Sequence, residues 1–194
     1  MAKSSANYFE PRIHLSGVEH PAALNFRLAN SATLTIGDVV RINTAGLLVR
    51  CAAGDAVLGV LAGVVDENDI NPFSFSYVNN TGATLTHDDT VVTASDNSTR
   101  THYLKGKVIV DVGGTILYYN DSSDTLAQTN VGQFFDHDSD ADQIDVSTAS
   151  DTSGQFQLVV LDPDGDSDVS KGLFRVSEPQ LLNYHANATA VNEA

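Results

Sequence analysis

Short β-branched runs separated by tight-turn signals fill residues 33–66 and constrain the chain to an all-β fold. The three runs read TLTIGDVVRIN (33–43), GLLVRCAAGD (46–55) and AVLGVLAGVVD (56–66). Gly-Asp pairs and the Asn-Thr-Ala-Gly sequence lie between them, and such residues mark turns between strands. The polar residues here form no catalytic pattern. The segment therefore favours a structural or binding protein over an enzyme.

Similar runs continue along the chain and predict a compact β-barrel or β-sandwich. Residues 73–78 alternate apolar and polar side chains, which places Phe73, Phe75 and Tyr77 on one face of a strand. Further strands are expected at 84–86, 90–93, 103–112, 115–119, 132–135, 155–161 and 172–176. No sustained helical period is present, and only the stretch after Ser177 favours a short helix.

The length of 194 residues fits one domain with irregular ends. Residues 1–21 contain Pro11 and Pro21 and are expected to form an extended N-terminal arm. The arm is expected to lie along a neighbouring subunit, either another copy or a capsid protein, and to add a strand to the sheet edge of that neighbour. Residues 22–178 are expected to form the β domain, with an acidic, loop-rich part from about residue 120. Residues 179–194 are expected to be a loose C-terminal tail.

The net charge of −15 excludes two classes of partner. Nucleic acids and anionic membranes both require basic patches, so neither is expected to bind. Met1 to Tyr8 lacks the apolar stretch of a signal peptide, and the apolar run 56–65 is too short for a membrane span. Synthesis in a cytoplasm is expected. The single cysteine, Cys51, lies in an apolar run and is expected to be a buried small side chain.

Two Asp-rich segments, 136–142 and 162–168, carry the strongest chemical signal. Alternating aspartates supply the oxygen ligands that Ca²⁺ prefers, although both segments lack the glycine and the final glutamate of an EF-hand loop. The alternative is an acidic, solvated loop between strands. The candidate calcium ligands are Asp162, Asp164, Asp166 and Asp168. No other cofactor is expected.

Candidate catalytic residues lack the partners that catalysis requires. His137 and Asp138 are adjacent, but no second histidine has metal-ligand spacing to them. Gly165-Asp-Ser167 is similar to the nucleophile block of one esterase family, yet Leu182 stands where that family has an aspartate before its histidine, here His185. The sequence therefore predicts a protein that is not an enzyme, with a hydrolase as the least favoured hypothesis.

One segment resembles a known family. The GDVVRI run from Gly37, the turn at residues 43–46 and the AGDAVLGVLAGVV run from Ala53 resemble the small β-rich decoration, or cement, proteins of tailed-bacteriophage heads. In that family a Gly-Asp-Val-Val strand precedes an Ala-Gly-Asp…Gly-Val strand in a small β-barrel or tulip-like domain. The match covers residues 30–66, and the acidic part from Asp121 has no counterpart.

The resemblance implies a structural virion protein that binds the outer surface of an icosahedral capsid and stabilises joints between capsid subunits. The expected partners are the major capsid protein and further copies of this chain, as a trimer, on the capsid exterior. The alternative is a calcium-dependent adhesin or receptor-binding β module. The expected contact residues are in the N-terminal arm, which is positively charged: Lys3, Arg12, Ile13 and Leu15.

Overall fold

The structure is a computed structural model that describes residues 8–15, 17, 23–30, 32–66, 84–87, 90–93, 99–111, 113–163 and 169–177. It confirms the all-β prediction, with one short 3₁₀ turn, η2 (Gln128–Asn130). Three predicted elements lie outside the described residues: the strand at 73–78, the short helix after Ser177 and the C-terminal tail at 179–194. The strands are β1 (Glu10–His14), β2 (Ala23–Arg27), β3 (Ala32–Thr35), β4 (Val39–Ile42), β5 (Leu48–Arg50), β6 (Gly59–Asp66), β7 (Thr84–His87), β8 (Thr90–Thr93), β9 (Thr99–His102), β10 (Leu104–Val110), β11 (Ile116–Asp121), β12 (Phe134–His137), β13 (Ile144–Ser150), β14 (Phe156–Leu161) and β15 (Lys171–Val176).

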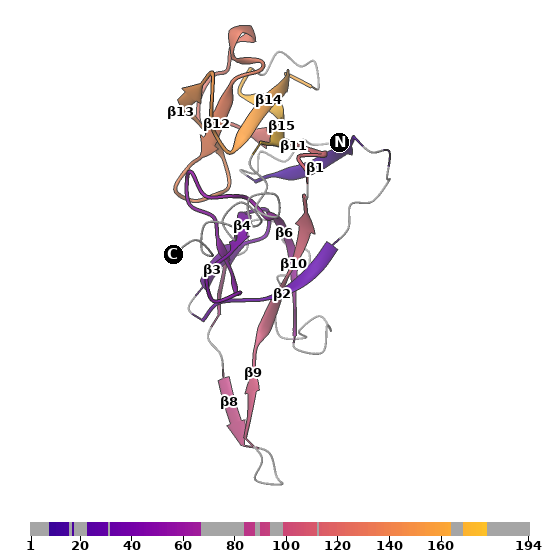
Figure 1. Ribbon diagram of the computed structural model, residues 1–194, viewed down its shortest axis with the longest axis vertical. Coiled ribbons are helices and arrows are strands. Elements are labelled where there is room, and N and C mark those ends of the chain that lie inside the picture. Colours follow the sequence, from indigo (N-terminus) through magenta and orange to yellow (C-terminus); the bar gives the residue numbers. More distant parts are fainter. Residues whose placement is uncertain are drawn as a thin grey trace, which may run out of the picture.

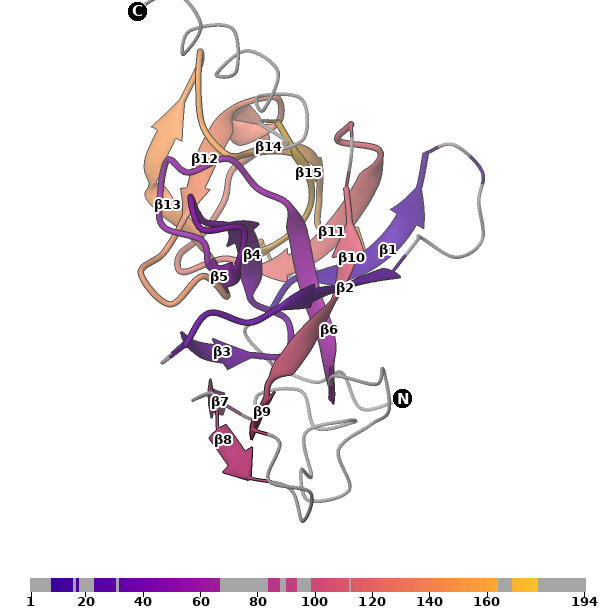
Figure 2. The same cartoon turned by 60° about the horizontal axis from the view of Figure 1, so that its bottom comes forward.

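Two antiparallel sheets form a sandwich-like fold. One has six strands in the order β1-β11-β15-β14-β12-β13, and the other has five in the order β2-β10-β6-β4-β5. β3 pairs with β7, and β8 pairs with β9 in a hairpin. In Figure 1 the six-stranded sheet lies at the top of the long axis, the five-stranded sheet in the middle and the β8–β9 hairpin at the bottom. The view in Figure 2 shows β10 crossing the five-stranded sheet and leading toward β9.

The core consists of two clusters that meet at β4. The larger cluster lies between the sheets and includes Phe135, Phe156 and Phe174. The smaller belongs to the five-stranded sheet and joins leucines and valines of β4, β5, β6 and β10. Val39 belongs to the first cluster and Val40 to the second, and both are fully buried. The two adjacent valines are therefore both buried because β4 is covered on both of its faces.

The turn before β4 joins three parts of the chain. Gly37 has a φ of 102°, and the side chain of Tyr8 occupies the position that a Cβ atom of Gly37 would take. The Phe9 amide donates to the Gly37 carbonyl at 3.2 Å, and the Val39 amide donates to the Ala141 carbonyl at 2.9 Å. The Gly-Asp-Val-Val sequence is therefore a junction between the N-terminal segment, the five-stranded sheet and the acidic part.

The described part of the N-terminal segment is extended and pairs with the sheet of its own chain. β1 forms the edge of the six-stranded sheet, where Ile13 lies opposite Leu117. Phe9 is 1% exposed and stacks on Phe156 with ring centroids 4.7 Å apart. The strand that the arm was predicted to add to a neighbouring subunit is instead added to the sheet of its own chain, where β1 pairs with β11.

Candidate interaction surface

The outer face of the six-stranded sheet gathers three of the four predicted contact residues. Ile13 and Leu15 are 47% and 57% exposed, and the Arg12 guanidinium lies 4.5 Å from the centre of the Tyr119 ring. The pairing is irregular between Pro11 and Ile13, so Arg12 is the extra residue of a bulge. Lys3 lies outside the described residues.

Apolar residues of three neighbouring strands surround these side chains. Leu117, Tyr119 and Leu173 form a small cluster separate from the main core. Because successive strand residues point to opposite faces, Ile116 and Tyr118 enter the core while Leu117 and Tyr119 lie on this side. We call the surface the β1 face and define it by eight residues: Arg12, Ile13, Leu15, Leu117, Tyr119, Val159, Leu173 and Arg175.

A shallow groove of about 270 Å³ runs beside this cluster. Leu15, Leu117 and Val159 contribute to its apolar wall. At its rim the Arg175 Nε donates to the Gln157 side-chain oxygen at 2.7 Å. Exposed apolar side chains bordered by polar groups are the usual composition of a protein contact surface. The part of this surface from β11, β14 and β15 is not predictable from the sequence, because the run from Ile116 to Tyr119 is apolar on both faces.

The first Asp-rich segment is anchored between the sheets. Ala141 has a φ of 58°, is fully buried in the main core, and accepts the hydrogen bond from Val39. The Asp138 carboxylate accepts the Asp140 amide at 3.1 Å, and the Asp142 carbonyl accepts from the Asn120 side chain at 2.8 Å. The segment is therefore a structural tie between the sheets, a role that neither hypothesis from the sequence included.

A buried aspartate lies beside this tie. Asp38 is 1% exposed, accepts the Thr35 amide at 2.8 Å and pairs with Arg50 at 2.9 Å. Arg50 also approaches the exposed Asp140 carboxylate at 3.7 Å. Burial raises the pKa of Asp38 to about 6, against the lowering effects of the Thr35 amide and Arg50. Removing one partner would leave a charge buried without compensation, so this pair is a structural element.

Cys51 and His137 are both buried and contact a shared glutamine. Burial raises the pKa of the Cys51 thiol to about 12, so the thiol is protonated at neutral pH. His137 is 1% exposed, its Nδ1 lies 2.6 Å from the Asp138 carbonyl, and burial lowers its pKa. The Gln155 side chain accepts from the His137 amide and donates to the Asp55 carbonyl at 2.6 Å. This buried network connects the two sheets.

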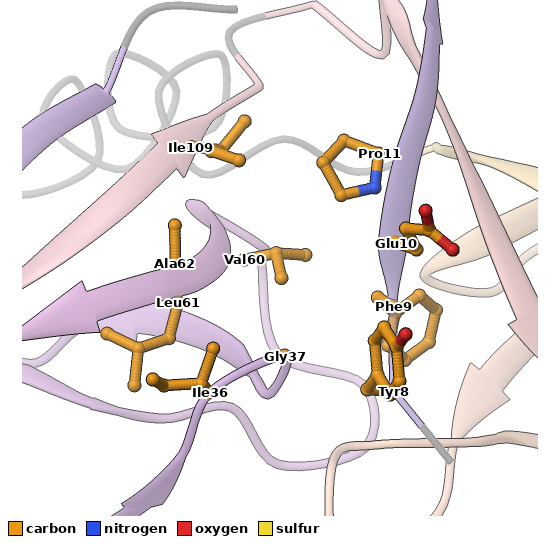
Figure 3. Close-up of a pocket in the computed structure, with 10 residues that line it drawn as sticks. All are labelled: Tyr8, Phe9, Glu10, Pro11, Ile36, Gly37, Val60, Leu61, Ala62 and Ile109. Atoms are coloured by element: carbon orange, nitrogen blue, oxygen red, sulfur yellow. The ribbon is translucent and has the colours of Figure 1, made fainter. Parts of the chain in front are cut away.

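An apolar cavity of about 150 Å³ separates β1 from the five-stranded sheet. Figure 3 shows Tyr8, Phe9 and Pro11 on one side and Val60, Ala62 and Ile109 facing them from β6 and β10. The one charged residue in its lining is Glu10. The cavity lacks the several converging polar groups that orient a small ligand.

The second Asp-rich segment is described only at its start. Asp162 has a φ of 47°, and its amide donates to the Lys171 carbonyl at 2.9 Å. Asp164, Asp166 and Asp168 lie outside the described residues. Within the described ranges, no three His, Cys, Asp or Glu side chains converge in a way that could hold a metal ion. No helix of the described part is long and apolar enough to span a membrane.

The chain is an all-β protein whose β1 face carries exposed apolar and cationic side chains. Comparison with known proteins gives no match to a family model, a curated protein or a solved structure.

Proposed function

We propose that the protein is a structural component of a virion that binds the exterior of an icosahedral capsid of the tailed-phage type. The observation that carries the proposal is the β1 face, which presents Ile13, Leu15 and Val159 to solvent beside two arginines. The segment that bears the resemblance to decoration proteins, residues 37–65, supports it by supplying three neighbouring strands of the five-stranded sheet, β6, β4 and β5.

The mechanism is added buried area across joints between capsid subunits. A specific contact buries about 800 Å² on each partner. A protein that binds only the assembled shell stabilises it by mass action, because separating the subunits then also requires the bound protein to dissociate. We propose that the β1 face contacts a neighbouring subunit, either a second copy of this chain in a trimer or the major capsid protein.

The proposed role is not enzymatic. Asp38, Cys51 and His137 are buried and bond to neighbouring backbone or side-chain groups. None of these three side chains is accessible to a substrate. The net charge of −15 supports a surface that stays soluble when many copies are displayed together.

The test is binding of the purified chain to empty capsids of tailed phages, measured by co-sedimentation and by the temperature at which the capsids disassemble. The wild-type chain should co-sediment and raise that temperature. An Ile13→Asp/Leu15→Asp variant should lose at least about tenfold in affinity, because it places two charges in the contact.

A Val169→Asp variant is the matched control, because Val169 is 41% exposed and is not part of the β1 face. It should bind like the wild type. Light scattering of each variant reports whether the β1 face also holds a trimer together. A wild-type chain that leaves every capsid tested unbound and unstabilised would contradict the proposed function.

A further inference from the structure

The groove on the β1 face has an apolar wall and one charged residue at its rim. Leu15 and Val159 are exposed there, and Val159 is the extra residue of a bulge in β14. Among the described residues that line the groove, Arg175 is the one with a charge, and none is acidic. A groove of about 270 Å³ takes a few side chains of a short segment rather than a folded domain.

Arg175 is held at this rim by a chain of hydrogen bonds. The Gln157 side-chain nitrogen donates to the Gly132 carbonyl at 2.7 Å, and the Gln157 side-chain oxygen accepts from the Arg175 Nε at 2.7 Å. This contact uses one of the five N–H groups of the guanidinium. Arg175 is exposed and forms no ion pair with any residue that the structure describes. The groove therefore suits a short apolar segment that carries an acid.

The residues that follow β15 have this composition. Residues 178–185 read EPQLLNYH, with one acid, Glu178, and no lysine or arginine. In the short helix that the sequence predicts here, Leu181 and Tyr184 are neighbours on one side, because they are three residues apart, and Leu182 borders them. A helix with such an apolar stripe is one of the usual occupants of a groove on a protein surface.

The direction of β15 leads this segment away from the groove of its own molecule. Figure 1 shows β15 beside β14 at the top of the long axis. The pairing of the two strands continues past Arg175, where the Ser177 amide donates to the Gln155 carbonyl at 2.8 Å. A residue before proline favours an extended backbone, so Glu178 is expected to continue this direction. At about 3.3 Å per residue, Pro179 is then about 13 Å from Arg175. The segment is thus directed toward a neighbouring molecule.

We propose that residues 178–185 of a neighbouring copy of this chain occupy the groove. Glu178 of one copy pairs with Arg175 of the next, and the apolar stripe of the segment packs on Leu15 and Val159. The inference deepens the function proposed above, on which it rests for the number of copies. Because the groove and the segment are different surfaces, the copies join head to tail, and a closed ring fills every groove.

The test uses the full-length chain and measures its mass in solution by size-exclusion chromatography with light scattering. The wild type should form a trimer. A Leu181→Asp/Leu182→Asp variant should lose at least about tenfold in the affinity between copies, because it places two charges in an apolar contact. The matched control is Asn183→Asp/Asn187→Asp, which adds the same charge on the other side of the predicted helix and should keep the wild-type mass.

A charge exchange tests the ion pair. Arg175→Glu should weaken the affinity between copies by about threefold to tenfold, because two carboxylates then face each other. Adding Glu178→Arg to the same chain should restore the assembly, since the new arginine faces the new glutamate. Restoration would also show that the first substitution leaves the fold intact. A double variant that assembles no better than Arg175→Glu would contradict the ion pair and overturn the proposal.

Three other results would also overturn the proposal. The first is a Leu181→Asp/Leu182→Asp variant that keeps the wild-type mass, and the second is an equal loss in the matched control. The third is a monomeric wild type whose stability falls on these substitutions, which would place the segment in the groove of its own molecule. An assembly that responds as expected but binds no capsid would leave this inference standing and refute the proposed function. Capsid binding by a monomeric chain would do the reverse.

Discussion

The two sheets use aspartate in different ways. In the five-stranded sheet, Asp38 is buried, paired with Arg50 and bonded to the backbone of its own turn. Beside the six-stranded sheet, Asp140 and Asp151 lie at the surface, while the backbone of the same acidic loop is held by Asn120 and Val39. The difference shows that the buried acid stabilises a turn and a strand of its own sheet, whereas the exposed acids belong to a loop that its backbone holds in place.

The largest effect is expected from removing the aromatic contact that holds the N-terminal segment in the core. Phe9→Ala should lower the free energy of unfolding by about 3–5 kcal/mol, because it deletes a fully buried ring that stacks on Phe156. Ile13→Ala, at an exposed position of the same strand, should change it by less than about 0.5 kcal/mol. Urea unfolding measures both. Equal, small effects would show that the N-terminal segment is not part of the core.

The second test concerns the junction before β4. Gly37→Ala should cost about 2–4 kcal/mol in urea unfolding, because the residue has a φ of 102° and the new Cβ would overlap Tyr8. Gly46→Ala is the control, since Gly46 also has a positive φ, 78°, but open space around its Cβ position. It should cost only about 1 kcal/mol. Identical losses would mean that the contact with Tyr8 contributes nothing.

The third test uses pH to separate the buried acid from the exposed ones. The pKa of Asp38 rises from 3.8 to about 6 on folding, so protonation favours the folded chain. The stabilisation is fully present below pH 3.8 and is lost as the pH rises through about 6. Relative to Asp38→Asn, the wild type should therefore gain about 1.4 kcal/mol when the pH falls from about 7.5 to about 5.

Two other groups make the mutant comparison necessary. Burial raises the pKa of Asp111 and therefore acts in the same direction as Asp38. Burial lowers the pKa of His137, so the stability that it contributes above pH 6.5 is lost as the pH falls. A difference between wild type and Asp38→Asn that does not change with pH would contradict the account of Asp38.

The smallest expected effect is that of calcium. The carboxylates of Asp136 and Asp138 already accept backbone amides at 3.1 Å, so the first Asp-rich segment should gain nothing from the ion. We expect the melting temperature to change by less than about 1 °C on addition of calcium or a chelator. A rise of several degrees that Asp162→Asn/Asp164→Asn abolishes would instead support the calcium-dependent adhesin.

The sequence predicted the fold class well because strand length and turn residues are local signals. Strands β4, β5, β6 and β15 match predicted runs within a few residues. β13 was missed, because Asp145, Ser147 and Ser150 give it the composition of a loop. Its place depends on contacts distant in sequence, such as the Ile144 amide donating to the Asn120 side chain at 2.8 Å. A contact between residues so far apart in the sequence cannot be predicted from a local sequence pattern.

The candidate surface was predictable only in part. Arg12, Ile13 and Leu15 were selected because they are a cationic and apolar group in an acidic chain, which is a property of composition. Val159 and Arg175 join them only through the strand order β1-β11-β15-β14. The structural role of Ala141 was also not predictable, because a left-handed alanine buried between two sheets has no sequence signature.

The most direct test of the central claim is a cryo-electron-microscopy map of capsids decorated with the chain. The account predicts that Ile13, Leu15 and Val159 of the β1 face lie against a capsid protein or a second copy of the chain. A map in which these three side chains face solvent in every bound copy would contradict it.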